Sequence, residues 1–342
     1  MPKATITQIS FNNQQDAFAI SSDDGIRIFN VDPLREVKHL KAEKVGSVRF
    51  VSLLDRTNIV AFVSGNPKPK FAPNVVMIYD LKKDKPIVEI TLDSPVIGIA
   101  ITATRLVVVL RMRIQLFELD AFRHTCTEET VDNKRALVAV SADKKNEILA
   151  YPGRLVGSVQ VVNIQHATQN ISQAPSVIRA HDNHLTHIVL NGQATIVATG
   201  STSGTVVKLF STKSLTLLHY LHRGLENCVF HNMRFAIDSD FLVVSSDRGT
   251  IHVYYYGHGA PTNLFSLRDR ITSINKFNLP VPGVKTEVAF APNAVTSKGK
   301  LDKDVIAIGY DGTYLRFIDS NPNVEGYECL MDLATGHEFL RF

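Results

Sequence analysis

Tryptophan is absent from the 342-residue sequence, cysteine is rare, and no hydrophobic run is long enough to cross a membrane. Runs such as VIGIAI at 96–101 and LVVVL at 106–110 contain five or six residues, whereas a spanning helix needs about twenty. The N-terminal residues MPKATITQISF lack the apolar stretch of a signal peptide. We therefore expect a cytoplasmic protein whose contact with any membrane is peripheral.

The three cysteines, Cys126, Cys228 and Cys329, are spread too widely for a CxxC motif or another metal-ligand spacing. Their small and odd number suits a reducing compartment. The motifs of common enzymes are missing as well, since the sequence has no GxSxG, GxxxxGK, GxGxxG or HExxH. We therefore expect no enzymatic activity and no cofactor.

A strong excess of charge of one sign is also lacking. The sequence contains 37 Lys and Arg residues and 33 Asp and Glu residues, so the net charge is +4. This balance gives no support for nucleic-acid binding. Twelve histidines add positive charge when they are protonated, so we expect an acidic partner to be favoured more strongly as the pH falls.

Three of these histidines, His181, His184 and His187, lie three residues apart in the string HDNHLTH. One interpretation is a metal site. In a strand, however, residues three apart point to opposite faces, and no cysteine or acidic cluster accompanies them. We favour a polar loop that leads into a strand, and we expect no metal.

Short strand-like segments rich in β-branched residues fill the sequence, and helical periodicity is nearly absent. The segments recur in one plan: an apolar strand enters a polar glycine turn, and an alternating strand leads out to an aromatic residue. Four copies share this plan, at 18–31, 196–211, 241–256 and 305–319, and three weaker copies lie at 59–80, 105–119 and 147–164, which makes seven. The turn glycines Gly157, Gly204 and Gly249 are 47 and 45 residues apart.

A repeat period in the forties with short strands is typical of a β-propeller, whose blades each contain four strands. The sequence therefore predicts an all-β fold, a single seven-bladed β-propeller over residues 1–342. Each copy supplies the central hairpin of one blade, and its glycine permits a turn with positive φ. Because the Trp-Asp signature of many propellers is missing, its place in the core is predicted to be filled by Tyr79, Phe117, Phe210, Tyr254 and Phe317.

Two hydroxyl-bearing turns flank a basic pair within residues 181–252. The turns are Ser201–Thr205 and Ser246–Thr250, and the string HYLHRGLEN between them contains His222 and Arg223. Hydroxyls, turn amides and a cation together form a good phosphate site, because arginine can bind two oxygens at once. The alternative is a pair of ordinary hairpin turns beside a solvated arginine, and the residues by themselves favour that interpretation.

The string LHRG at 221–224 resembles the Phe/Leu-Arg-Arg-Gly signature of the PROPPIN family, seven-bladed β-propellers that bind phosphoinositides in autophagy. The resemblance covers essentially the whole chain and is closest to the animal WIPI branch, in the subgroup of the nematode EPG-type member. The strings that carry it include GIRIFNVDPL (25–34), SGNPKPKFAPNVVMIYDL (64–81), IRAHDNHLTHIVLN (178–191), VSSDRGTIHVY (244–254) and INKFNLPVPG (274–283).

The resemblance implies two phosphoinositide sites, one on each side of the signature, which bind phosphatidylinositol 3-phosphate and the 3,5-bisphosphate. The positions that match the first site are His181, Ser201, Thr205 and His222, with support from Lys208. The positions that match the second site are Arg223, Ser246, Thr250 and His252, and Gly224 completes the signature.

The sequence departs from the family signature at His222, which stands in place of the first arginine. A neutral imidazole offers one donor, whereas guanidinium offers five and a permanent charge. We therefore expect the first site to be weak at neutral pH and stronger when His222 is protonated. Binding should persist through the second site at reduced avidity.

Residues 257–272, GHGAPTNLFSLRDRIT, are predicted to form a membrane-facing loop. Its apolar residues Leu264, Phe265 and Leu267 are expected to enter the lipid interface, while Arg268 and Arg270 meet anionic headgroups. The alternative is a surface loop whose apolar residues fold back on the protein.

The resemblance also implies a protein partner, since members of this branch bind the autophagy lipid-transfer protein through their first blades. Asn12 matches a position used there, Gln14 stands at the spacing of a neighbouring acid, and Asp16 lies two residues further on. A turn residue is the alternative interpretation of Asn12.

Together, these features predict a monomeric, non-enzymatic propeller that binds no nucleic acid. It is expected to recognise phosphatidylinositol 3-phosphate on preautophagosomal and phagophore membranes and to recruit the autophagy lipid-transfer protein there. The alternative is a WD-type protein-interaction scaffold with weak or lost lipid binding, which His222 makes plausible.

Overall fold

The computed structural model of the chain describes residues 4–165, 175–257, 270–291, 303–318, 324–327 and 330. The chain divides into two compact units, Met1–Val108 with Ala289–Phe342 and Val109–Val288. Nearly all regular structure in the described residues is strand, and α1 (Ala42–Val45) is a single helical turn. No helix in this described part of the chain is long and apolar enough to cross a membrane.

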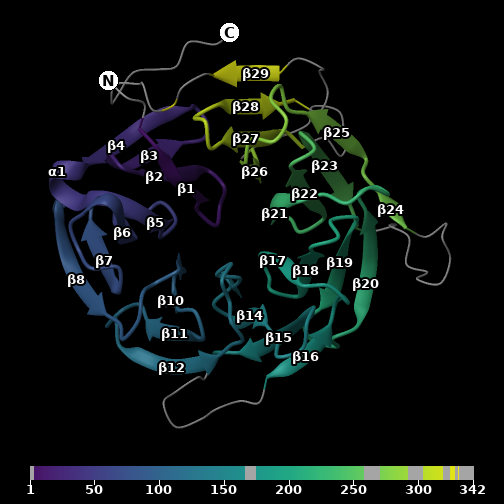
Figure 1. Cartoon of the computed structure of the whole chain (residues 1–342), viewed down its shortest axis with the longest axis horizontal. Coiled ribbons are helices and arrows are strands. Elements are labelled where there is room, and N and C mark those ends of the chain that lie inside the picture. Colours follow the sequence, from purple (N-terminus) through teal and green to yellow (C-terminus); the bar gives the residue numbers. More distant parts are fainter. Residues whose placement is uncertain are drawn as a thin grey trace. The chain divides into compact units, whose positions relative to one another are not determined.

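The described strands form seven sheets, built mainly from antiparallel pairs of successive strands (Figure 1). The first three sheets contain β1 (Ile6–Phe11), β2 (Ala17–Ser22), β3 (Gly25–Asn30) and β4 (Arg35–Lys41); β5 (Gly46–Leu53), β6 (Ile59–Pro69), β7 (Val75–Asp80) and β8 (Lys85–Thr91); and β9 (Gly98–Ile101), β10 (Arg105–Val109), β11 (Arg113–Glu118) and β12 (His124–Glu129).

The next three sheets contain β13 (Ala139–Val140), β14 (Ile148–Pro152), β15 (Ser158–Asn163) and β16 (Ser176–Arg179); β17 (Leu185–Leu190), β18 (Ile196–Ser201), β19 (Val206–Ser211), β20 (Leu217–His222) and β24 (Ile271–Thr272); and β21 (Phe230–Phe235), β22 (Phe241–Ser246), β23 (Thr250–Tyr255) and β25 (Asn275–Asn278). The last sheet contains β26 (Thr286–Phe290), β27 (Val305–Gly309), β28 (Tyr314–Phe317) and β29 (Val324–Tyr327), and no N-terminal strand joins it among the described residues.

Each of the seven sequence repeats coincides with the hairpin made by the second and third strands of one sheet. The repeat at 196–211, for example, spans β18 and β19, and Gly204 in the turn between them has a φ of 66°. The aromatic residues predicted for the core are at most 6% exposed: Tyr79, Phe117, Phe210, Tyr254 and Phe317. The predicted seven-bladed β-propeller is therefore confirmed.

Both faces of the β17–β20 sheet are buried within the second unit. Val197 and Phe210 pack with residues of the β13–β16 sheet, whereas their neighbours Ala198 and Leu209 pack with residues of the β21–β23 sheet. Because alternate residues of a strand point to opposite faces, a strand buried on both sides reads as a nearly continuous apolar run. Full burial of one aliphatic side chain stabilises the fold by about 1.5–3 kcal/mol.

The β1–β4 sheet of the first unit is built in the same way. Phe18 and Ile20 pack in a core with residues of β26–β28, and Ala19 on the opposite face packs with residues of β5–β7. In both units, this stacking leaves the ends of the strands, rather than their faces, available to carry exposed polar residues.

Candidate functional site

The predicted site residues of the second unit gather at one end of two neighbouring sheets. The β18–β19 and β22–β23 hairpins turn at this end, and β20 finishes there, since Val206 pairs with His222 across β19 and β20. Ser246 and Thr250 face each other across the β22–β23 turn. This arrangement places seven predicted site residues at that end of the two sheets: Ser201, Thr205, His222, Arg223, Gly224, Ser246 and Thr250.

The β18–β19 turn packs tightly against the connection that leads from β20 to the next sheet. A Cβ atom on Gly204 would lie 1.9 Å from the carbonyl oxygen of Cys228, so no other residue fits there without a shift of the backbone. The Cys228 thiol donates a hydrogen bond to the carbonyl oxygen of Gly204 at 3.1 Å. The hydroxyl-bearing turn is therefore held beside the segment that carries Arg223.

The half-buried Arg223 is fixed by backbone groups of its own surroundings. Its amide donates to the carbonyl oxygen of Thr205 at 2.9 Å, and its Nε donates to that of Gly204 at 3.2 Å. A terminal nitrogen of the guanidinium also donates to the carbonyl oxygen of Glu226. No carboxylate of the described residues forms an ion pair with Arg223, so its charge is oriented without being neutralised.

Ser246 and Thr250 carry hydroxyl groups that are buried and lack a hydrogen-bond partner within the described residues. A buried polar group without a partner costs about 1–3 kcal/mol. Burial raises the pKa of the Cys228 thiol, and a contact of hydrogen-bonding type with the Ser246 hydroxyl lowers it. A thiol is only a weak partner for this hydroxyl. An oxygen-rich ligand would satisfy both hydroxyls.

His181 and Lys208 share a cavity of about 330 Å³ that also includes Leu155, Val156 and Arg179. Lys208 donates through Nζ to the carbonyl oxygen of Ala180 at 2.7 Å, and its ammonium lies 5.4 Å from the centre of the Tyr220 ring. The His181 Nε2 lies 3.0 Å from the Thr199 hydroxyl oxygen. Burial and the Lys208 charge lower the pKa of His181 to about 4, so its ring is neutral at pH 7.

His222 is half-buried at the end of β20. Burial and the nearby charges of Arg270 and Arg223 lower its pKa below the usual value of 6.5, so the ring is neutral at pH 7. Arg270 reaches this place because β24 runs parallel to β20, with His222 opposite Thr272 (Figure 1). Arg270, which the sequence predicted only as a membrane contact, therefore adds a positive charge next to the first predicted site.

His252 faces Lys276 across β23 and β25. Its Nδ1 lies 3.2 Å from the hydroxyl oxygen of Ser273, and burial with the charges of Lys276 and Arg223 lowers its pKa to about 4. Sequence reasoning missed Ser273 and Lys276, because Lys276 reaches His252 only through the pairing of β25 with β23, and Ser273 lies just before β25. Only the resemblance of the string at 274–283 pointed to this segment.

The second unit thus brings cations, hydroxyls and neutral imidazoles together at one end of two sheets. Such a set suits an anion with several oxygens, because hydroxyls and imidazole N–H groups donate while arginine and lysine supply charge. The neutral rings limit how far mild acid raises the positive charge here, since burial opposes their protonation. These donors and charges fit the binding of an anion.

Other predicted residues lie elsewhere. Leu264, Phe265, Leu267 and Arg268 fall outside the described residues, whereas Arg270 is described and exposed. In the histidine string, the His187 Nε2 lies 3.2 Å from the carbonyl oxygen of His231. No group of three metal-binding side chains occurs among the residues that the structure describes.

The predicted partner-binding residues lie in the first unit, in the turn between β1 and β2. Asn12 is 1% exposed, and its side chain bonds to Asp16 and accepts from the Ala17 amide. Asp16 also pairs with Arg56, and Gln14 is exposed. Asn12 therefore stabilises the turn, as its alternative interpretation expected, and Gln14 is the more accessible side chain.

Comparison with known proteins gives a consistent result. A sequence model of the PROPPIN family matches residues 5–262. Ectopic P granules protein 6 of Caenorhabditis elegans is 31% identical over 355 residues, which cover 98% of this chain and 90% of that protein.

Solved structures share the fold. Kluyveromyces lactis Hsv2 with its complete loop 6CD has a TM-score of 0.75 and 23% identity, covering 92% of this chain and 93% of that chain. KlAtg21, in its complex with the coiled-coil of AgAtg16, has a TM-score of 0.74 and 19% identity, covering 92% of this chain and 94% of that chain.

Proposed function

The chain belongs to the PROPPIN family of autophagy β-propellers, and we propose that it binds phosphatidylinositol 3-phosphate and the 3,5-bisphosphate on membranes. In this proposal, it acts in the cytoplasm at preautophagosomal and phagophore membranes and recruits the autophagy lipid-transfer protein for autophagosome formation. It performs no chemical step, because its role is to hold a lipid headgroup and a protein partner at the same time.

The observation that carries this proposal is the second site around Arg223. The buried hydroxyl of Thr250 lacks a partner among the described residues, and the buried hydroxyl of Ser246 has only the weak Cys228 thiol. The Arg223 charge lies close enough to lower the pKa of His252 on the strand that follows the same turn. Phosphate oxygens would accept from both hydroxyls and from the guanidinium, so binding would satisfy groups that the fold leaves unsatisfied.

The first site contributes more weakly at neutral pH. His181 and His222 are neutral there, which leaves Lys208 and Arg270 to supply the charge. Two weak headgroup contacts on one surface raise the overall affinity, because the second contact forms at a high effective concentration.

The partner surface is proposed on the first unit, at Asn12, Gln14 and Asp16. Gln14 offers an exposed side chain, and the Asn12 amide holds the turn that presents it. The complex of KlAtg21 with a coiled-coil supports protein partners for members of this fold.

Vesicle flotation tests the proposal. Wild type is compared with Arg223→Ala and with Ser246→Ala/Thr250→Ala on phosphatidylcholine vesicles with and without phosphatidylinositol 3-phosphate. Both variants should lose at least about tenfold in affinity, because charge-assisted bonds to phosphate contribute about 1.5–3 kcal/mol. Arg123→Ala is the matched control, since Arg123 is exposed and pairs with Glu118 away from the site.

A thermal unfolding measurement separates binding from folding. Ser246→Ala/Thr250→Ala should leave stability unchanged or raised, because it removes buried hydroxyls that have no partner. Wild-type binding that is equal with and without the phosphoinositide, or unchanged by Arg223→Ala, contradicts the proposal.

A protein-interaction scaffold with weak lipid binding is the second candidate. The neutral imidazole of His222, in place of the first signature arginine, favours it. This candidate predicts that wild type fails to float with phosphatidylinositol 3-phosphate vesicles while the lipid-transfer partner still binds.

A further inference from the structure

Leu155 and Val156 form an exposed apolar tip on the turn between β14 and β15. Their exposed fractions are 55% and 54%, although burial is the rule for large apolar side chains in this chain. Two basic residues, Arg154 on the same turn and Arg179 at the end of β16, are exposed next to the tip. None of these four residues was predicted as a phosphoinositide-binding residue, although Leu155, Val156 and Arg179 line the cavity that contains His181 and Lys208.

Hydrogen bonds hold the turn that carries the tip in place. Both the amide and the hydroxyl of Ser158 donate to the carbonyl oxygen of Leu155, at 3.1 and 2.6 Å. The carbonyl oxygen of Gly157 accepts from the amides of Ala180 and His181, at 3.1 and 3.0 Å. These bonds hold the turn against the connection that carries His181. The two apolar side chains therefore project from a turn that is fixed in place.

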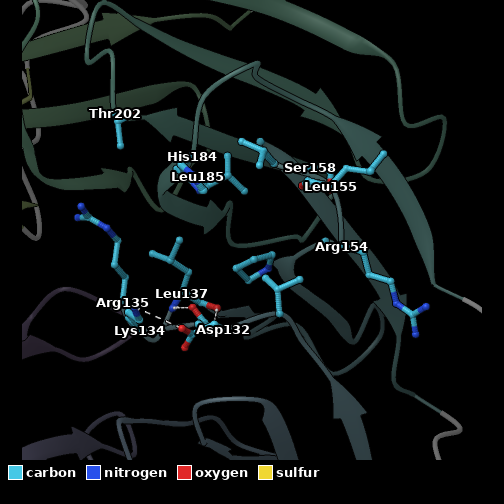
Figure 2. A pocket seen from close by; sticks show the side chains of 16 residues that line it. Asp132, Lys134, Arg135, Leu137, Arg154, Leu155, Ser158, His184, Leu185 and Thr202 are labelled. Carbon is cyan, nitrogen blue, oxygen red and sulfur yellow. Dashed lines mark hydrogen bonds and ion pairs between the residues drawn. The ribbon is translucent and has the colours of Figure 1, made fainter.

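Leu155 and Val156 border two basic cavities. One is the cavity of about 330 Å³ that contains His181 and Lys208. The other measures about 490 Å³ and includes Lys134, Arg135 and Arg154. Figure 2 shows Arg154 extending away from the other labelled side chains, on the far side of this second cavity from Arg135.

The acidic side chain of the second cavity is already neutralised. Asp132 pairs with Arg111 through two hydrogen bonds, at 2.6 and 2.9 Å, and with Lys134 at 3.4 Å. Arg135, Arg154 and Arg179 form no ion pair within the described residues. The first cavity also contains the exposed Asp182, which lies near Lys208. Because Arg135, Arg154 and Arg179 outnumber this single acid, the surroundings of the tip carry net positive charge.

We propose that Leu155 and Val156 enter the lipid interface as a membrane anchor, while Arg154 and Arg179 meet anionic headgroups. This inference rests on the proposed phosphoinositide binding, because the tip borders the cavity of the first site. An apolar tip flanked by cations is the pattern that binds the interface of an anionic membrane. Two residues are too few for the core of a protein interface, which buries about 800 Å² per partner.

The absence of tryptophan makes a direct test possible. Leu155→Trp or Val156→Trp provides a single tryptophan whose emission reports its surroundings. With vesicles of phosphatidylcholine, phosphatidylserine and phosphatidylinositol 3-phosphate, the emission should shift to the blue, and brominated lipids should quench it. Ile237→Trp is the control, since Ile237 is 49% exposed in the β21–β22 turn, at the opposite strand ends from Ser246.

Co-sedimentation of the same samples distinguishes failure of the proposed anchor from failure of the proposed membrane binding. Bound protein with unshifted and unquenched emission at both tip positions overturns the anchor but leaves the proposed function standing. Protein that stays in the supernatant overturns both.

A second pair of variants tests the energetic contribution of the tip. Leu155→Ser/Val156→Ser and Arg154→Glu/Arg179→Glu should each weaken vesicle binding about three- to tenfold without changing the thermal midpoint, because all four side chains are exposed. Unchanged vesicle binding in both variants overturns the anchor. Loss of a protein partner together with unchanged vesicle binding would assign the tip to that partner.

Discussion

At position 222, a single residue is expected to set the strength of the first proposed site. His222 lies at the end of β20 beside two arginines, and burial with these charges keeps the ring neutral at pH 7. An arginine there would carry a permanent charge and a planar set of donors. In the proposed function, the histidine would therefore leave most of the headgroup binding to Arg223 at neutral pH.

We predict that His222→Arg strengthens binding to phosphatidylinositol 3-phosphate vesicles on the order of tenfold at pH 7.4, because it adds charge-assisted hydrogen bonds. Wild type should gain affinity as the pH falls and His222 becomes protonated, later than a histidine with the usual pKa, while the variant should change less with pH. Flotation at pH 7.4 and at pH 5.5 measures both effects. Equal affinities of the two proteins at pH 7.4 would contradict this account.

The β18–β19 turn illustrates how an element positions the site. Its glycine adopts a φ of 66° and lies directly against the Cys228 carbonyl. The same contact holds the hydroxyl-bearing residues beside Arg223, so the backbone of the turn and the electrostatics of the site depend on each other.

We predict that Gly204→Ala destabilises the protein by about 2 kcal/mol or more, since a positive φ and a backbone clash act together. Gly224→Ala is the matched control, because a Cβ atom there meets nothing within 4 Å. It should change stability by no more than about 0.5 kcal/mol. Urea unfolding of the two variants gives the comparison, and similar losses in both would refute the role of the turn.

Buried histidines make the stability of the folded protein depend on pH. The pKa values of His181, His187 and His252 are lowered from 6.5 to about 4 in the folded protein, mainly by burial. Between pH 6.5 and pH 4 the unfolded chain binds more protons than the folded one. Stability is therefore complete above pH 6.5, falls as the pH drops through this window, and levels off below pH 4.

We predict that the free energy of unfolding at pH 5 is lower than at pH 7.5 by about 1–2 kcal/mol for each of these histidines. Urea unfolding at the two pH values measures the difference. His252→Asn removes one titrating group, so its stability should depend less on pH than that of wild type. A free energy that is equal at both pH values would show that burial does not hold these rings neutral.

The sequence by itself determined the repeat, the fold class and the core. The apolar strand appears in every copy, and the glycine turn and the aromatic end appear in most, because each blade must bury two faces and turn sharply between its middle strands. The LHRG string and the two hydroxyl turns also pointed to the site, since they are local patterns. These features were predictable because their causes lie within about fifteen residues.

Tertiary structure decided which distant residues share a surface. Lys276, Ser273 and Arg270 reach the site only through the pairing of β25 with β23 and of β24 with β20. The unpaired hydroxyls of Ser246 and Thr250, the exposed tip at Leu155 and Val156, and the lowered histidine pKa values follow from packing between sheets. Burial and electrostatic surroundings depend on contacts between residues far apart in the chain, and a linear pattern does not encode them.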